Sequence, residues 1–334
     1  MLRTTCARIF ALGLTVLTVV GAGGCGGSEP APATGADEKQ STQVKILMNW
    51  FAQPEQAGYW QAEAQGLGAK HGIALENVQG GPQIQTIPQV ASGKAQFGVT
   101  QADTLMQARA EGVPVVFIFA PFEHTLQCLM YHPSSGIRDF PDVDGHTVAI
   151  APSGGFWPWV KARFDLDDVK EVNYTGVIAN FVQDDDLVQQ CLLTAEPYYA
   201  SKQGVAHAEL KTADVGYDPY YQGLFTTERV IRENPDLVRQ VVATAKEGWE
   251  AFAQDPAPAR ELITKVNKDS DPQLVDFAHR KMLDEGLLVT PLKAMDASRW
   301  SDLYRQLDET GQFKRSFDVA GAYTNDYFPG KDGT

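Results

Sequence analysis

The run Val113–Ala120, VPVVFIFA, constrains the fold of this chain more than any other stretch, because it is apolar on nearly every residue. A strand with one face in water alternates apolar and polar residues, whereas a parallel strand covered on both faces stays apolar throughout. From Val44 onward, strand-like runs alternate with helix-like segments. This alternation predicts an α/β fold built on a mostly parallel sheet with flanking helices.

The N-terminus has the pattern of an export signal. Arg3 and Arg8 precede the apolar run Ile9–Val20 and give the chain a positively charged start. This run is too short to span a bilayer and fits a signal-peptide core. Cys25 follows Ala22-Gly23-Gly24, and this sequence resembles a bacterial lipobox. We therefore expect residues 1–24 to be a signal peptide and Cys25 to carry lipid. The alternative is an ordinary cleaved signal with an incidental cysteine.

Residues 25–42 are expected to form a flexible tether that follows the lipidated cysteine. After Cys25 they contain no aromatic residue and no Ile, Leu, Val or Met, so they cannot bury enough apolar surface to become ordered. A tether behind a lipid anchor places the folded part outside the cytoplasm, close to the cell membrane.

Charge and cysteine content narrow the choice of partners and compartment. The formal net charge is −14, or about −16 without the two leader arginines, and no dense basic patch occurs that would bind nucleic acid. Besides Cys25, the cysteines downstream of the leader are Cys128 and Cys191. They either pair, as exported proteins permit, or remain two buried thiols.

The order of elements predicts two lobes joined by two crossovers of the chain. The first lobe is expected over residues 43–122 plus 217–334, and the second over residues 123–216. Within the second lobe we expect a helix over Asp184–Gln190 and a strand over Cys191–Ala195. The C-terminal third is expected to be helical, because Asp255-Pro256 and Asp271-Pro272 are typical helix starts.

The chain carries none of the common motifs of catalysis or metal binding. Its six histidines are scattered, no two at metal-ligand spacing, and HExxH, CxxC, P-loop and GxSxG sequences are absent. We therefore expect that the chain binds neither a metal nor another cofactor, and that it is not an enzyme.

Polar groups beside aromatic rings recur at the predicted carboxyl ends of strands, the edge where open α/β sheets bind ligands. The four places are Asn49-Trp50-Phe51, Thr100-Gln101-Ala102-Asp103, Ser153-Gly154-Gly155-Phe156-Trp157 and Glu196-Pro197-Tyr198-Tyr199. Tyr59 and Tyr174 complete the set of candidate ligand contacts. Aromatic faces stack on a flat ring, and a carboxylate accepts from an exocyclic amine or a ring N–H. The alternative is that each place is only a cap, a turn or, for Trp50 and Phe51, part of the core.

Three stretches carry a resemblance to a known family: Asn49-Trp50 followed by Pro54 and Gly58, then Ala91–Val99, and Thr194-Ala195-Glu196-Pro197-Tyr198. Through them the chain resembles the extracytoplasmic substrate-binding proteins of ABC importers. More narrowly, it is similar to the family that includes the binding proteins for thiamine-pyrimidine precursors and the fungal enzymes of pyrimidine synthesis. Nitrate, sulfonate and taurine binders are related to this family. The resemblance extends over roughly Val44–Phe252.

The resemblance implies a two-lobed periplasmic-binding-protein fold of type II, a monomer that delivers a solute to a permease and its ATPase. The implied ligand is a small flat heteroaromatic molecule. Trp50, Phe156, Trp157 and Tyr198 would stack on it, and Asn49, Ser153 and Glu196 would make polar contacts. Riboflavin-like rings are an alternative ligand. An anion binder of the sulfonate, nitrate or taurine type is another, but none of the four strand-end motifs contains a Lys or Arg.

Two departures from the family pattern separate this chain from the enzymes. The pyrimidine group usually has Asp before the first Trp, where this chain has Asn49, and a His where it has Gln56. The resemblance implies that the fungal enzymes need that histidine for synthesis. Gln56 therefore favours binding without chemistry over a periplasmic enzyme of pyrimidine metabolism.

Overall fold

A computed structural model describes residues 41–81, 83–151 and 155–330. The predicted signal peptide, Cys25 and nearly all of the predicted tether lie outside the described residues. The first strand, β1, already begins at Thr42, the last residue assigned to the tether.

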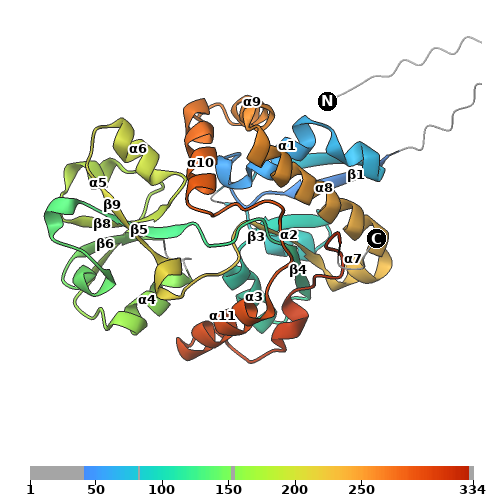
Figure 1. Ribbon diagram of the computed structural model, residues 1–334. Helices are drawn as coiled ribbons and strands as arrows, with labels where there is room; N and C mark the ends of the chain where they lie inside the picture. Colours follow the sequence, from blue (N-terminus) through green and yellow to red (C-terminus); the bar gives the residue numbers. More distant parts are fainter. Residues whose placement is uncertain (1–40, 82, 152–154, 331–334) are drawn as a thin grey trace, which may run out of the picture. The chain divides into compact units, whose positions relative to one another are not determined.

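Two five-stranded sheets organise the described chain (Figure 1). Sheet A has the strand order β2-β1-β3-β10-β4, and sheet B has the order β7-β6-β8-β5-β9. The strands of sheet A are β1 (Thr42–Leu47), β2 (Ile73–Val78), β3 (Phe97–Thr100), β4 (Val115–Phe119) and β10 (Gly223–Thr227). Those of sheet B are β5 (Gln127–Tyr131), β6 (Thr147–Ile150), β7 (Lys170–Asn173), β8 (Leu187–Leu192) and β9 (Ala208–Lys211).

Four of the five strands in each sheet run in the same direction, which confirms the predicted α/β fold. In sheet A, β1 pairs in parallel with β2 and β3, while β10 runs antiparallel between β3 and β4. In sheet B, β6 pairs in parallel with β7 and β8, while β5 runs antiparallel between β8 and β9. The boundaries predicted for the two lobes, residues 43–122 plus 217–334 and residues 123–216, stay a prediction.

The sequence of strand β4 is apolar on nearly every residue because both faces of the strand are buried. Val115 and Phe117 belong to one hydrophobic core, and Val116 and Ile118 belong to another. Because successive side chains of a strand point to opposite faces, sheet A is covered on both sides. The expected parallel pairing of this strand was wrong, because its partner in the ladder is the antiparallel strand β10.

Helices pack on both faces of sheet A and around sheet B (Figure 1). On one face of sheet A, α1 contributes Trp60 to the core and α8 contributes Trp249. On the other face, α3 contributes Met106 and α11 contributes Trp300. The helices are α1 (Ala57–Ala64), α2 (Thr86–Ala91), α3 (Ala102–Ala110), α4 (Phe156–Phe164), α5 (Ala179–Gln183), α6 (Glu196–Lys202), α7 (Glu228–Glu233), α8 (Pro235–Gln254), α9 (Ala257–Val266), α10 (Pro272–Asp284) and α11 (Ala297–Glu309).

The helix expected over Asp184–Gln190 was wrong. The helix there, α5, ends at Gln183, and β8 begins at Leu187. Strand β8 lies between β5 and β6, so Gln189 is as buried as its apolar neighbours. A central strand that buries a glutamine has no alternating pattern, and periodicity alone cannot separate it from a short helix.

Cys128 and Cys191 form a disulfide that joins β5 to β8. The two cysteines are opposite each other in the antiparallel register, with their Cα atoms 4.9 Å apart. Of the two possibilities that the sequence left open, the structure has the disulfide. No helix of the described chain is both long enough and apolar enough to cross a bilayer.

Candidate functional site

The carboxyl end of β1 presents two exposed rings and one amide. Trp50 is 37% exposed and Phe51 is 40% exposed, and their rings meet edge to face with centroids 5.7 Å apart. The alternative that both rings belong to the core was therefore wrong. The Asn49 Oδ1 atom accepts a hydrogen bond from Gln56 Nε2 at 2.8 Å, so the two family departures contact each other.

Glu55 carries a buried carboxyl group from sheet A into contact with sheet B. It lies in the short 3-10 helix η1 (Pro54–Gln56) that follows β1, and only 2% of it is exposed. The Oγ1 atom of Thr194, just beyond β8, donates a hydrogen bond to Glu55 Oε1 at 2.6 Å. The carboxyl ends of β1 and β8 therefore meet at this residue.

Glu196 lies two residues beyond Thr194 and faces the same contact. It is the first residue of α6, and Pro197 follows it in the first turn of that helix. Its Oε2 atom accepts the backbone N–H of Leu192 at 2.7 Å, and its Oε1 atom accepts the hydroxyl of Tyr174. Burial raises the pKa of Glu196, and these two hydrogen bonds lower it in part.

Asp103 supplies the third carboxyl group, from the first turn of α3. It is 1% exposed, and its Oδ2 atom accepts the hydroxyl of Tyr217 at 3.2 Å. Gly155 comes so close that a Cβ atom there would lie 2.8 Å from Asp103 Oδ2. A side chain at Gly155 would therefore separate α3 of sheet A from α4 beside sheet B. Burial raises the pKa of Asp103.

Tyr221 connects these three carboxyl groups, which we call the carboxylate cluster (Glu55, Asp103 and Glu196). Burial raises the pKa of the Tyr221 hydroxyl, and all three carboxylates raise it further. A hydrogen bond with Gln101 acts in the opposite direction. Within residues 41–81, 83–151 and 155–330, no Lys, Arg or His forms an ion pair with the cluster.

The pKa values of the three carboxyl groups are raised because the groups are buried and no cation of the described chain compensates their charge. Burial raises the pKa of Glu55 to about 7, the nearby negative charge of Glu196 adds to this, and the hydrogen bond from Thr194 opposes it. A buried carboxylate is destabilised in its charged form. The site therefore favours an incoming group that is positively charged or rich in N–H donors.

Glu55 should make stability depend on pH. Its pKa is raised above the usual 4.5, so the folded state holds its proton more tightly than the unfolded state, and stability falls as pH rises from about 4.5 through 7. Between pH 6 and 8 we expect wild type to lose about 1 kcal/mol relative to Glu55→Gln. Urea unfolding of both proteins at several pH values measures this difference, and parallel curves for the two proteins would contradict it.

Three other predicted site residues lie in the hydrophobic cores, namely Tyr59, Phe156 and Trp157. Tyr59 is fully buried, packs on Trp249 and donates its hydroxyl to the Gln222 carbonyl at 2.8 Å. Phe156 and Trp157 are each 3% exposed and belong to a hydrophobic core. Ser153 and Gly154 lie outside the described residues.

Tyr198 contacts α10 rather than the cluster. Its ring is 5.4 Å from that of Phe277, and its hydroxyl donates to Asp271 Oδ2 at 2.6 Å. The structure thus brings together Asn49, Gln101, Asp103, Gly155, Tyr174 and Glu196, and it places Tyr59 and Tyr198 elsewhere. Ligand contact by any of these residues stays a prediction.

Sequence reasoning missed four members of the site: Glu55, Thr194, Tyr217 and Tyr221. Thr194 belongs to a stretch that carries the family resemblance, and residue 217 is the predicted start of the return to the first lobe. Glu55 and Tyr221 belong to none of the four strand-end motifs. One signal was available for Glu55, since it follows Pro54 in the same stretch as Asn49 and Trp50. Its burial depends on a residue 139 positions away, which no local pattern reveals.

The site holds no arrangement suited to a metal ion, because no group of three or more potential metal-ligand side chains occurs in the described residues. A cavity of about 540 Å³ lies beside the crossovers, and none of the three carboxylates of the cluster lines it.

Two mixed sheets with a site at their facing strand ends define the periplasmic-binding-protein fold, and solved structures share it. The periplasmic aliphatic sulphonate binding protein SsuA from Escherichia coli matches with a TM-score of 0.67 at 17% identity, covering 84% of this chain and 91% of that one. A family model described as "NMT1/THI5 like" matches residues 53–259, more than half of the chain. The chain therefore belongs to the NMT1/THI5-like family.

Two curated relatives differ in how much of the chain they match. Riboflavin-binding protein RibY of Chloroflexus aurantiacus is 25% identical over 353 aligned residues, covering 97% of this chain and 98% of that protein. A putative thiamine biosynthesis protein of Haemophilus influenzae is 24% identical over 114 residues, covering 34% of this chain and 36% of that protein. The full-length likeness is thus to a binding protein.

Proposed function

We propose that this chain is the extracytoplasmic solute-binding component of an ABC importer. It would bind a small flat heteroaromatic molecule between its two sheets and deliver it, as a monomer, to a permease and its ATPase. The fold and the family support this proposal, and binding proteins of this kind close around a solute by hinge motion. The predicted Cys25 anchor would keep the protein at the membrane, and palmitate labelling that is lost in Cys25→Ala would support it.

The chemical class of the ligand is inferred from the carboxylate cluster, which has no cationic partner in the described chain. Its three carboxyl groups come from both sheets, and tyrosine hydroxyls surround them. Carboxylates accept hydrogen bonds from exocyclic amines and ring N–H groups. The exposed ring of Trp50 supplies a face for stacking. A ligand resembling the aminopyrimidine precursor of thiamine matches both features.

A riboflavin-like ligand is the second candidate, and the full-length likeness to RibY favours it. An isoalloxazine ring is also flat and carries an N–H donor. Binding of a sulfonate or nitrate is disfavoured, because buried carboxylates repel an anion. A periplasmic enzyme of pyrimidine metabolism is disfavoured by Gln56, whose amide is hydrogen-bonded to Asn49.

Titration calorimetry of the purified protein against an aminopyrimidine, riboflavin, an alkanesulfonate and nitrate tests the proposal. We expect saturable binding of the aminopyrimidine or the flavin, and none of the two anions. Tight binding of either anion would overturn the ligand class. Mass spectrometry of the recovered ligand tests the absence of chemistry, since an enzyme would return a changed mass.

A further inference from the structure

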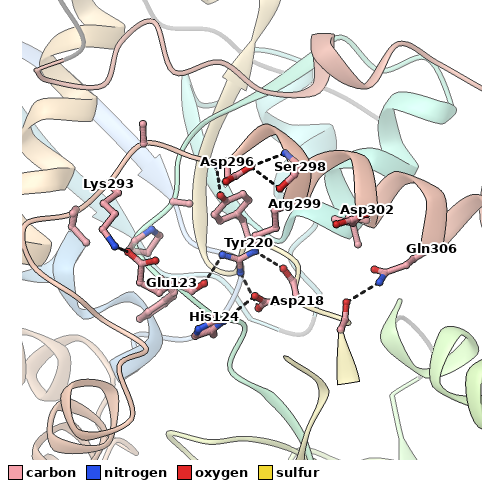
Figure 2. Close-up of a pocket in the computed structure, with 17 residues that line it drawn as sticks. Glu123, His124, Asp218, Tyr220, Lys293, Asp296, Ser298, Arg299, Asp302 and Gln306 are labelled. Carbon is pink, nitrogen blue, oxygen red and sulfur yellow. Dashed lines mark hydrogen bonds and ion pairs between the residues drawn. The ribbon is translucent and has the colours of Figure 1, made fainter. Parts of the chain in front are cut away.

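Helix α11 holds both crossovers of the chain through side chains on one of its faces (Figure 2). The first crossover, residues 120–126, connects β4 to β5, and the second, residues 216–222, leads back to β10. The chain passes between the two sheets only in these two segments of its described part. A hinge motion of one sheet against the other must therefore be absorbed in the crossovers.

Arg299 contacts both crossovers at once. Its Nη1 atom donates to the Glu123 carbonyl in the first crossover. In the second, its Nε atom donates to the Asp218 carbonyl, and its Nη2 atom donates to Asp218 Oδ1 at 3.0 Å and to the Pro219 carbonyl at 3.1 Å. The guanidinium also lies over the ring of Tyr220, 4.0 Å from its centroid. All three of its nitrogen atoms are thus occupied by crossover groups.

Asp218 extends this network back to the first crossover. Its Oδ1 atom accepts the backbone N–H of Thr125 at 2.6 Å, and its Oδ2 atom lies 2.9 Å from His124 Nδ1. Two turns along α11, Gln306 Nε2 donates to the Gly216 carbonyl at 2.7 Å. The two crossovers are therefore held at a fixed spacing by Arg299, Asp218 and Gln306.

The cavity of about 540 Å³ lies at this place, and Figure 2 shows its labelled side chains around Arg299. Crossover residues line one side of it and residues 292–306 line the other. The polar groups of the crossovers border this cavity, whereas apolar side chains of the same segments, such as Phe122 and Tyr217, are buried in the hydrophobic cores. On the side of the cavity, the hydrogen bonds from α11 therefore add to core packing in setting the spacing of the two crossovers.

We propose that Arg299 is a positioning residue that couples the two crossovers and thereby controls how readily the two sheets separate and release ligand. This inference rests on the proposed solute binding. In the present structure the sheets are in contact through Glu55 and Thr194, and this is the arrangement that the Arg299 contacts accompany. Loss of Arg299 would free the crossovers, favour separation of the sheets and speed ligand release. The planar guanidinium reaches several acceptors at fixed angles, which a lysine ammonium cannot reproduce.

The test compares Arg299→Gln and Arg299→Lys with wild type. With riboflavin or an aminopyrimidine as the probe, whichever binds wild type, we expect dissociation to be about tenfold faster from both variants. The association rate should change little, since changes of this kind act mainly on dissociation. Arg109→Gln is the matched control: both arginines have side chains that are 15% exposed, and Arg109 also donates to a backbone carbonyl and a carboxylate, away from the crossovers. It should lower the melting temperature without changing the dissociation rate.

A ligand-free measurement separates this inference from the proposed function. Paramagnetic labels at the exposed positions Lys45 on β1 and Lys170 on β7 report the distance between the sheets. We expect a broader distance distribution in Arg299→Gln and Arg299→Lys than in wild type or Arg109→Gln. Failure to bind any tested solute would overturn the proposed function and leave this distance test intact. Wild-type distance distributions in both Arg299 variants would overturn the role of Arg299.

Discussion

Replacing Glu196 by glutamine is expected to weaken binding of an aminopyrimidine on the order of 30-fold, because a hydrogen bond to a charged acceptor contributes about 2 kcal/mol. Glutamine keeps the shape of the side chain and can still accept the N–H of Leu192. The melting temperature should change little or rise, since the variant removes a buried charge whose pKa is already raised. Titration calorimetry and thermal unfolding of the same samples measure both effects.

Glu63→Gln is the matched control for this prediction. Glu63 is also a half-buried glutamate whose Oε2 atom accepts a backbone N–H, that of Asn77, at 2.7 Å. Burial raises its pKa as well. It lies on α1, contacts β2 of sheet A through Asn77, and forms no hydrogen bond with the carboxylate cluster. Equal affinities of Glu196→Gln and wild type, or equal losses in Glu196→Gln and Glu63→Gln, would remove Glu196 from the ligand site.

Removing the disulfide should produce the largest loss of stability. We expect Cys128→Ala with Cys191→Ala to lower the free energy of unfolding by about 4 kcal/mol, because a bridge that closes a long loop restricts the unfolded chain most. The bridge here joins residues 63 positions apart. Both cysteines are buried, at 0% and 4% exposure, so two small cavities add to the loss. Urea unfolding of the double variant measures the effect.

A reductant provides the control for the disulfide. Adding dithiothreitol should shift the unfolding of wild type toward that of the double variant and leave the double variant unchanged. Identical unfolding midpoints for oxidised wild type and the double variant would show that the bridge adds nothing to stability. An oxidised bridge also suits a protein exported from the cytoplasm.

The fold was largely predictable because its strands are short apolar runs separated by turn residues. The apolar run Val113–Ala120 predicts a strand that is buried on both faces, and β4 lies within this run. Its partner was not predictable, since β10 comes from a distant part of the sequence. Strand β8 was missed in part because a buried glutamine removed the alternating pattern. Local patterns thus locate elements, but they do not decide how distant elements pair.

The site was predictable to the extent that strand ends determine it. Asn49, Gln101, Asp103 and Glu196 were expected from polar residues at those ends, and the structure brings them into one region. The aromatic candidates were less informative, because a ring in a sequence looks the same whether it faces a solute or a core. Trp50 is exposed, whereas Trp157 is buried. That difference arises from tertiary packing alone.

The position of β10 between β3 and β4 has a consequence for how the protein is made. Its partners β3 and β4 end at Thr100 and Phe119, whereas β10 begins at Gly223, so the polypeptide of sheet B is synthesised in between. During that interval β3 and β4 each lack the neighbour that pairs their backbone groups, and unpaired strand edges invite association with other chains. A nascent chain that emerges from N- to C-terminus therefore completes sheet A only after all of sheet B has appeared. The antiparallel insertion of β10 between β3 and β4 is therefore the step that pairs these two open edges.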